Sequence, residues 1–174
     1  RRAGLAAVRW LVDLQNRDGG IPTFCRGWGA LPFDRSSQDL TAHTLRAWNA
    51  WRNQLDPTAR PDLDRAMQRG LGYLRKSQRA DRSWVPLWFG NERAREEENP
   101  VYGTAQVVNY LCAVPALAEQ ASAMLKEAGT YLIRAQGGDG SWGGEAGVPG
   151  TIEETAVSML QIFHEREPTR PLNQ

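Results

Sequence analysis

The sequence predicts an all-α protein built from three helical hairpins, and two observations support this prediction. One pattern occurs three times in the same register, with an aromatic residue, a Gln five positions later and an Asp three positions after the Gln. No window of about four to eight residues alternates between apolar and polar side chains as a half-buried strand does. Repeats at a fixed period indicate stacked supersecondary units. The three copies contain Gln15, Gln78 and Gln136.

Each repeat is predicted to hold two helices, because its apolar residues recur at helical spacing. The first helix runs up to the Gln, and Gly residues that follow allow the backbone to leave the helix. A Thr-Ala step then marks the second helix, 26, 26 and 19 residues after the Gln in the three repeats. The expected helices cover 1–15 and 40–51, then 66–78 and 103–114, then 117–136 and 153–163.

The repeats predict one domain at residues 1–165 and an irregular tail at 166–174. Stacked hairpins bury a shared core, so we expect an arc of an α/α toroid, a ring of the α6/α6-barrel type. The loop 92–99 carries a run of charges and is expected to be a solvated insertion. The repeats themselves cover about 1–52, 62–114 and 117–164.

The Gln and Trp residues of the repeats have a mechanical explanation. A Gln side chain at the end of a helix is expected to bond the unpaired carbonyls there and the N–H groups that open the next helix. Trp84 and Trp142 each follow their Gln by six residues. We expect each indole ring to stack over its Gln and shield these bonds, so the motif is structural and not catalytic.

Composition excludes several classes of protein. There are 21 basic and 20 acidic residues, a net charge of +1, and no basic face for nucleic acid. No apolar run is long enough to span a bilayer. Two distant cysteines suit a reducing compartment, so a cytoplasmic location is expected, with peripheral contact at a membrane left open. The chain begins with Arg in a helical pattern, which indicates a piece of a longer protein.

Candidate site residues emerge when the Thr-Ala steps are aligned. Asp39, Tyr102 and Glu153 each stand two residues before the Thr. We expect them to form a belt at the opening turns of the second helices, although the helix dipole alone suffices to explain Glu153. Asp39 and His43 are four residues apart, so they share a helical face within hydrogen-bonding reach. A carboxylate beside an imidazole favours imidazolium, and a purely structural pair is the alternative.

Nearly the whole chain resembles the squalene–hopene and oxidosqualene cyclases, the class II triterpene cyclases. The Gln-to-Trp spacing is similar to that of their QW repeats, and residues 37–43 resemble a family segment that ends in Asp-x-Thr-Ala-His. Residues 99–104, with Trp84 and Trp88 before them, resemble the aromatic segment that follows. Two features differ. Ile21-Pro22 replaces the expected Trp, which weakens the first clamp, and the Asp-x-Asp-Asp catalytic acid is absent.

The resemblance implies that the longer protein is an isomerase of triterpenoid, hopanoid-type biosynthesis. It would cyclise an isoprenoid polyene such as squalene by protonation, without metal or organic cofactor. His43, oriented by Asp39, would hydrogen-bond the missing acid and strengthen it, and Tyr102 would stabilise carbocations with its ring face. Further substrate contacts are expected at Trp88, Phe24, Cys25 and Gln106, with a small buried thiol as the alternative for Cys25.

The isolated chain is expected to be inactive, because it lacks the acid that His43 would activate. The family closes its ring with about six hairpins, whereas this chain supplies three. We expect the open arc to expose the stripes Leu40-Thr44-Trp48 and Val107-Leu111. Exposed apolar patches of this kind rarely persist, so a homodimer is predicted.

Two other interpretations stay open. Zinc-dependent protein prenyltransferase subunits share the ring of helical hairpins, and Cys25, Asp39 and His43 are conceivable ligands. Zinc needs three or four ligands in compatible geometry, and no Asp-x-Cys pair is present. The other interpretation is a non-catalytic ring used for binding or assembly, which gains weight from the absent acid motif.

Overall fold

The computed structural model describes residues 2–27 and 31–166, the last six of these by their backbone alone. Six α-helices within these ranges form three hairpins, which confirms the predicted all-α fold of toroid type. The inner helices are α2 (Gln38–Arg52), α4 (Pro100–Cys112) and α6 (Ile152–Arg166). The outer helices are α1 (Arg2–Leu14), α3 (Arg60–Ser77) and α5 (Pro115–Ala135).

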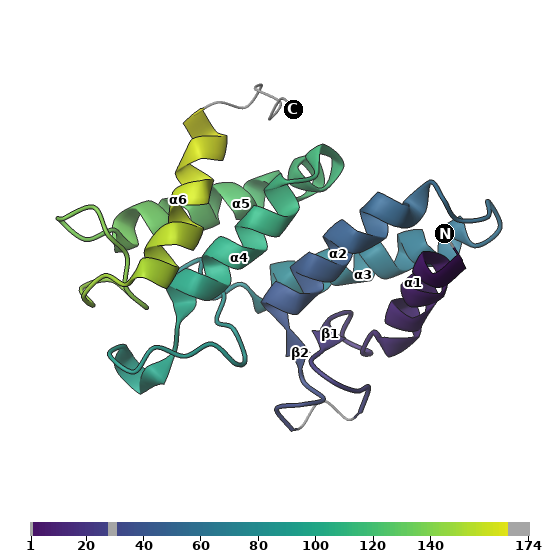
Figure 1. Ribbon diagram of the computed structural model, residues 1–174, viewed down its shortest axis with the longest axis horizontal. Helices are drawn as coiled ribbons and strands as arrows, with labels where there is room; N and C mark the ends of the chain where they lie inside the picture. The colour runs from purple at the N-terminus through teal and green to yellow at the C-terminus, as the bar shows by residue number, and fades with distance from the viewer. Residues whose placement is uncertain (1, 28–30, 167–174) are drawn as a thin grey trace.

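The inner helices lie side by side and begin at the same end of the molecule, the lower end in Figure 1. Helix α4 packs on α2 on one side and on α6 on the other, while α3 and α5 lie behind this layer. One face of each inner helix therefore packs on outer helices, and the opposite face belongs to the inside of the toroid.

Two helices begin at least three residues earlier than apolar spacing predicts. Helix α3 starts at Arg60, and its first turns are mostly polar, so apolar spacing does not reveal them. Pro61 lies in the first turn, where a missing N–H costs nothing. Helix α4 starts at Pro100, since the Asn99 side chain caps it by accepting a hydrogen bond from the Tyr102 N–H over 3.1 Å. The expected tail at 166–174 lies outside the described residues, apart from Arg166 at the end of α6.

The expectation of no strands is wrong for one short pair. Strands β1 (Ile21–Pro22) and β2 (Ser36–Ser37) are antiparallel, with Ile21 opposite Ser37. Two residues are too few to show an alternating pattern, so sequence periodicity cannot reveal them. The pair closes the loop between α1 and α2 and leads directly into the start of α2.

The core lies between the inner and outer layers. Trp48, Val107 and Leu111 are fully buried, and Thr44 is also buried. Leu40, the first residue of its stripe, is half-buried, so the expectation that these stripes are exposed in an open arc is wrong. An amphipathic helix turns its apolar stripe toward the neighbouring layer, and here the outer helices cover it within the same chain.

The Gln clamps differ from the expected arrangement. The Gln15 amide donates to the Gly19 carbonyl over 2.8 Å and to the Ala66 carbonyl, in the middle of α3, over 2.9 Å. Gln78 binds the Met124 carbonyl of α5 in the same way, over 3.1 Å. Each of these two Gln side chains thus ties the end of one outer helix to the middle of the next outer helix. The partners are fixed by how neighbouring hairpins stack, which the spacing within one repeat does not specify.

The two Trp residues of the clamps act through their indole N–H groups. Trp84 donates to the Leu74 carbonyl over 2.9 Å, and Trp142 donates to the Leu132 carbonyl over 2.8 Å. Both carbonyls lie in the last turns of the outer helices, and the Leu74 carbonyl also accepts from the Gln78 backbone N–H over 3.1 Å. Ile21 occupies the equivalent place in the first repeat and has no such donor.

No helix in the described part of the chain has the length and hydropathy that crossing a membrane requires.

Candidate functional site

The start of α2 carries Asp39 and His43 on successive turns. Asp39 is buried, and its carboxylate accepts a hydrogen bond from the Ser37 hydroxyl. His43 is exposed, and its ring stacks on Tyr110 of α4 with centroids 4.5 Å apart and planes at 26°. The described contacts include no hydrogen bond between Asp39 and His43. The spacing predicted that the two side chains share a helical face. In the structure the Asp39 carboxylate accepts from the Ser37 hydroxyl, and the His43 ring stacks on Tyr110 of α4.

The facing stripe on α4 consists of Tyr102, Gln106 and Tyr110 at intervals of four residues. Burial is the largest cause that raises the pKa of Tyr102, and a hydrogen bond with Gln106 opposes it. The charges of Glu153 and Asp39 raise this pKa further, so both act on one phenol. Asp39 of α2 and Glu153 of α6 therefore both contribute to the raised pKa of Tyr102 on α4.

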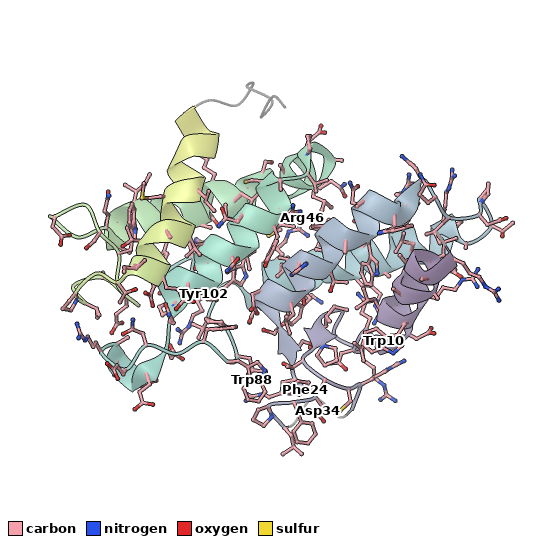
Figure 2. The ribbon with its side chains drawn as sticks, in the orientation of Figure 1. Trp10, Phe24, Asp34, Arg46, Trp88 and Tyr102 are labelled. Atoms are coloured by element: carbon pink, nitrogen blue, oxygen red, sulfur yellow. The ribbon has the colours of Figure 1, made fainter. Side chains whose placement is uncertain are left out.

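Aromatic side chains from two loops gather below this belt. Phe24 and Trp88 have ring centroids 6.0 Å apart at 56°, and the Trp88 indole donates to the Thr23 hydroxyl over 2.5 Å. Both rings remain exposed, Phe24 at 68% and Trp88 at 49%. Figure 2 shows the two side chains together beneath β2, while Tyr102 lies near the meeting of α4 and α6. The contact joins the loop of the first repeat to that of the second.

Cys25 lies apart from the belt. It is exposed, which contradicts the alternative of a small buried thiol. It lines a pocket of about 820 Å³ together with Asn16, Arg26 and Phe33, and none of the described lining residues comes from α2 or α4. The structure therefore separates Cys25 from Asp39, His43, Tyr102 and Gln106.

Three further residues were not found by sequence reasoning. Phe89 packs on Tyr102 with centroids 4.8 Å apart. Tyr110 continues the α4 stripe, and its spacing from Gln106 was a usable signal. Glu154 is buried at the start of α6 and accepts hydrogen bonds from the amides of Asn91 and Asn99, over 3.0 and 2.7 Å.

The charged loop is more than a solvated insertion. Asn91 just before it, Asn99 at its end and Ala94 within it are all buried. A short 3₁₀ turn, η1 (Arg95–Glu97), forms its tip, and its charged side chains are mostly exposed. Glu154 therefore attaches both ends of the loop to the start of α6.

This arrangement presents ring faces near a carboxylate and an imidazole. Ring faces attract cations, and an imidazole donates hydrogen bonds to an acid. No Asp-x-Asp-Asp sequence occurs among the 174 residues. Within the ranges that the structure describes, no three His, Cys, Asp or Glu side chains are grouped in a way that holds a metal ion.

Comparisons with known proteins give the family. The squalene-hopene cyclase C-terminal domain matches residues 2–155. A probable squalene–hopene cyclase of Sinorhizobium fredii is 28% identical over 93% of this chain, which covers 26% of the relative. An ent-copalyl diphosphate synthase of a Streptomyces species is 32% identical over 78% of the chain and 23% of the relative. A drimenyl diphosphate synthase of Streptomyces showdoensis is 27% identical over 93% of the chain and 27% of the relative.

The chain spans about a quarter of the length of these relatives. The match of the family domain extends from the start of α1 to the first turn of α6, so it includes the first two hairpins and the outer helix of the third. The chain belongs to the squalene–hopene cyclase family of class II terpene cyclases, as a C-terminal domain.

Proposed function

We propose that this chain is the C-terminal portion of an enzyme that cyclises an isoprenoid polyene by protonation. The observation that carries the proposal is the inner face shared by α2 and α4. His43 of α2 stacks there on Tyr110 of α4, and the charge of Asp39 raises the pKa of Tyr102, which begins the same α4 stripe. This face falls within the matched family domain.

The acid in this proposal is an Asp-x-Asp-Asp carboxyl outside these 174 residues. Its proton goes to one carbon of a terminal alkene, and the other alkene carbon becomes a cation. The electron pair of the next double bond forms a C–C bond to that cation, and the cation moves along the chain until a proton is lost. His43 donates a hydrogen bond to the acid, and Asp39 supplies negative charge one turn away.

The aromatic side chains serve the cationic stage. Phe89 packs on Tyr102 and Phe24 packs near Trp88, and Figure 2 shows Tyr102, Trp88 and Phe24 toward the lower side of the molecule. Such faces attract a cation without offering it a nucleophile, whereas water would quench it. The rings therefore suit a carbocation that moves along a folded polyene.

The substrate we propose is a squalene-like hydrocarbon. Asp39 and Glu153 both lie close enough to affect the Tyr102 phenol, so the belt is acidic. Like charges repel, so an acidic belt disfavours an anionic diphosphate group beside it. Relatives named as squalene–hopene cyclases and as diphosphate synthases both match, and the assay below includes both substrate classes. Peripheral contact with a membrane is the proposed route for so apolar a substrate.

A non-catalytic ring module is the second candidate, favoured by the absence of an Asp-x-Asp-Asp sequence in the 174 residues. Such a module binds the polyene without converting it. The two candidates differ in turnover by the longer polypeptide that carries this chain.

The test uses that longer polypeptide, with squalene or geranylgeranyl diphosphate and product analysis by mass spectrometry. We expect cyclised squalene from the wild type and a loss of about 10²- to 10⁴-fold in His43→Ala, with an unchanged melting temperature. His164→Ala, the same change at the other histidine, is the matched control. Wild-type turnover in His43→Ala contradicts the proposed role. The isolated chain is expected to give no product.

A further inference from the structure

His43 is held by a ring contact and not by a described hydrogen bond. Its imidazole is exposed on α2, and the Tyr110 ring of α4 covers one of its faces at a centroid distance of 4.5 Å. The planes differ by 26°, a stacked geometry. A stacked face leaves the edge of the imidazole free, and the edge carries both ring nitrogens. The contact therefore fixes the plane in which His43 donates hydrogen bonds.

Tyr110 is itself firmly placed. It is half-buried and packs against the main core, and its neighbour Leu111 is fully buried. On the same turn, the Asn109 amide donates to the Val157 carbonyl of α6 over 3.0 Å. Helix α4 is thus tied to α6 on one side and packed on α2 on the other, so Tyr110 is a rigid support for the His43 ring.

The surroundings keep Tyr110 neutral. Burial is the largest cause that raises the pKa of its phenol, the charge of Asp39 raises it further, and Arg46 lowers it. The net direction is upward, so the phenol keeps its proton at neutral pH. A neutral phenol has an electron-rich ring face, which attracts a charged imidazolium stacked on it. Figure 2 shows Arg46 between α2 and α4.

We propose that Tyr110 is a positioning residue of the acid site, whose ring holds the His43 imidazole so that its N–H edge faces the acid. This inference rests on the proposed function, because it acts through His43. The aromatic ring performs the task and the phenol hydroxyl is dispensable.

The first arm of the test examines the isolated chain by proton NMR. The chain has two histidines, so His43→Ala identifies the His43 ring signals. We expect contacts between the His43 ring protons and those of residue 110 in the wild type and in Tyr110→Phe, and their loss in Tyr110→Leu. Absence of these contacts in the folded wild-type chain overturns the inference.

The second arm measures squalene cyclisation by the longer polypeptide. We expect Tyr110→Leu to lower kcat by about tenfold to a hundredfold with an unchanged KM, because a misplaced catalytic group loses rate and not affinity. Tyr110→Phe is expected to retain the wild-type rate. Tyr131→Leu, at a half-buried tyrosine of the outer helix α5, is the matched control and is expected to leave kcat unchanged.

The outcomes separate the two proposals. A wild-type polypeptide without cyclase activity defeats the proposed function. Activity in the wild type that Tyr110→Leu leaves unchanged defeats the positioning role alone. If Tyr110→Leu melts below the assay temperature, Tyr110→Met replaces it, since it fills similar space without a ring. A rate loss in Tyr110→Phe as large as in Tyr110→Leu also contradicts the inference.

Discussion

The backbone N–H of Trp84 donates to the hydroxyl of Thr104 over 2.9 Å. The same bond joins Trp142 to Thr155 over 3.0 Å and Ile21 to Thr41 over 2.9 Å. In each hairpin it attaches the loop after the outer helix to the opening turn of the inner helix. The Thr of the Thr-Ala step is therefore an anchor for the loops that bring aromatic side chains to the belt.

Replacing the Thr104 hydroxyl tests this anchor. Thr104 is fully buried, so Thr104→Val leaves the Trp84 N–H without its partner. We expect a loss of about 1–3 kcal/mol in the free energy of unfolding, measured in urea. Thr104→Ser is expected to keep most of the stability. Thr130→Val, at an exposed position on α5, is the control, and an equal loss there would argue against a specific anchor.

The tie between neighbouring outer helices predicts a difference between two equivalent glutamines. Gln15 is buried and reaches Ala66 of α3, whereas the described bond of the exposed Gln136 stays within its own loop, to Gly140. Gln15→Leu is expected to lower the free energy of unfolding by about 1–2 kcal/mol more than Gln136→Leu. Thermal melts of the two variants check this, and equal losses would contradict the role of Gln15 between hairpins.

The two hydrogen bonds that Glu154 accepts are expected to stabilise the charged loop. Glu154→Leu removes the acceptor shared by the Asn91 and Asn99 amides, with an expected loss of about 2–3 kcal/mol and faster proteolysis within 91–99. Glu154→Gln keeps an acceptor oxygen and is expected to lose less. Glu153→Gln, at the exposed neighbour, is the control. A loop that resists protease equally in Glu154→Leu would show that other contacts hold it.

The tyrosines predict an alkaline limit to stability. Burial is the first cause that raises the pKa of all four, Tyr73, Tyr102, Tyr110 and Tyr131. A phenol in the unfolded chain ionises near pH about 10. Because the folded values are higher, stability is intact below pH about 10 and falls as pH rises above it. Phenolate absorbance should therefore rise together with unfolding, and a tyrosine that titrates normally in the folded chain would contradict this.

The exposed side of α6 is where pairing of the isolated chain is now expected. Ile152 is 90% exposed, and Met159 and Leu160 are more than half exposed. Burying this patch against a second copy removes apolar surface from water. Light scattering is expected to show a dimer that Met159→Glu with Leu160→Glu converts to a monomer. A wild-type monomer at high concentration would refute the pairing.

The repeats alone were enough to predict the hairpins. Three in-register copies identified the outer helices, and the Thr-Ala steps identified the inner ones. The equivalence of Thr41, Thr104 and Thr155 in the structure follows from their equal place in the sequence. Local spacing carries this information because helical periodicity is a property of each segment. It also brought Asp39 and His43 onto one face.

Tertiary structure decided everything that depends on a neighbouring helix. Trp48 of the α2 stripe and Leu111 of the α4 stripe are both buried, because the outer helices of the same chain cover them. Asp39 and His43 share a helical face, but their described contacts are with other residues: Asp39 accepts a hydrogen bond from Ser37, and His43 stacks on Tyr110. A periodic pattern fixes which residues share a face of one helix. It does not fix how that face is rotated against the next helix, and this rotation selects the partner of each polar group.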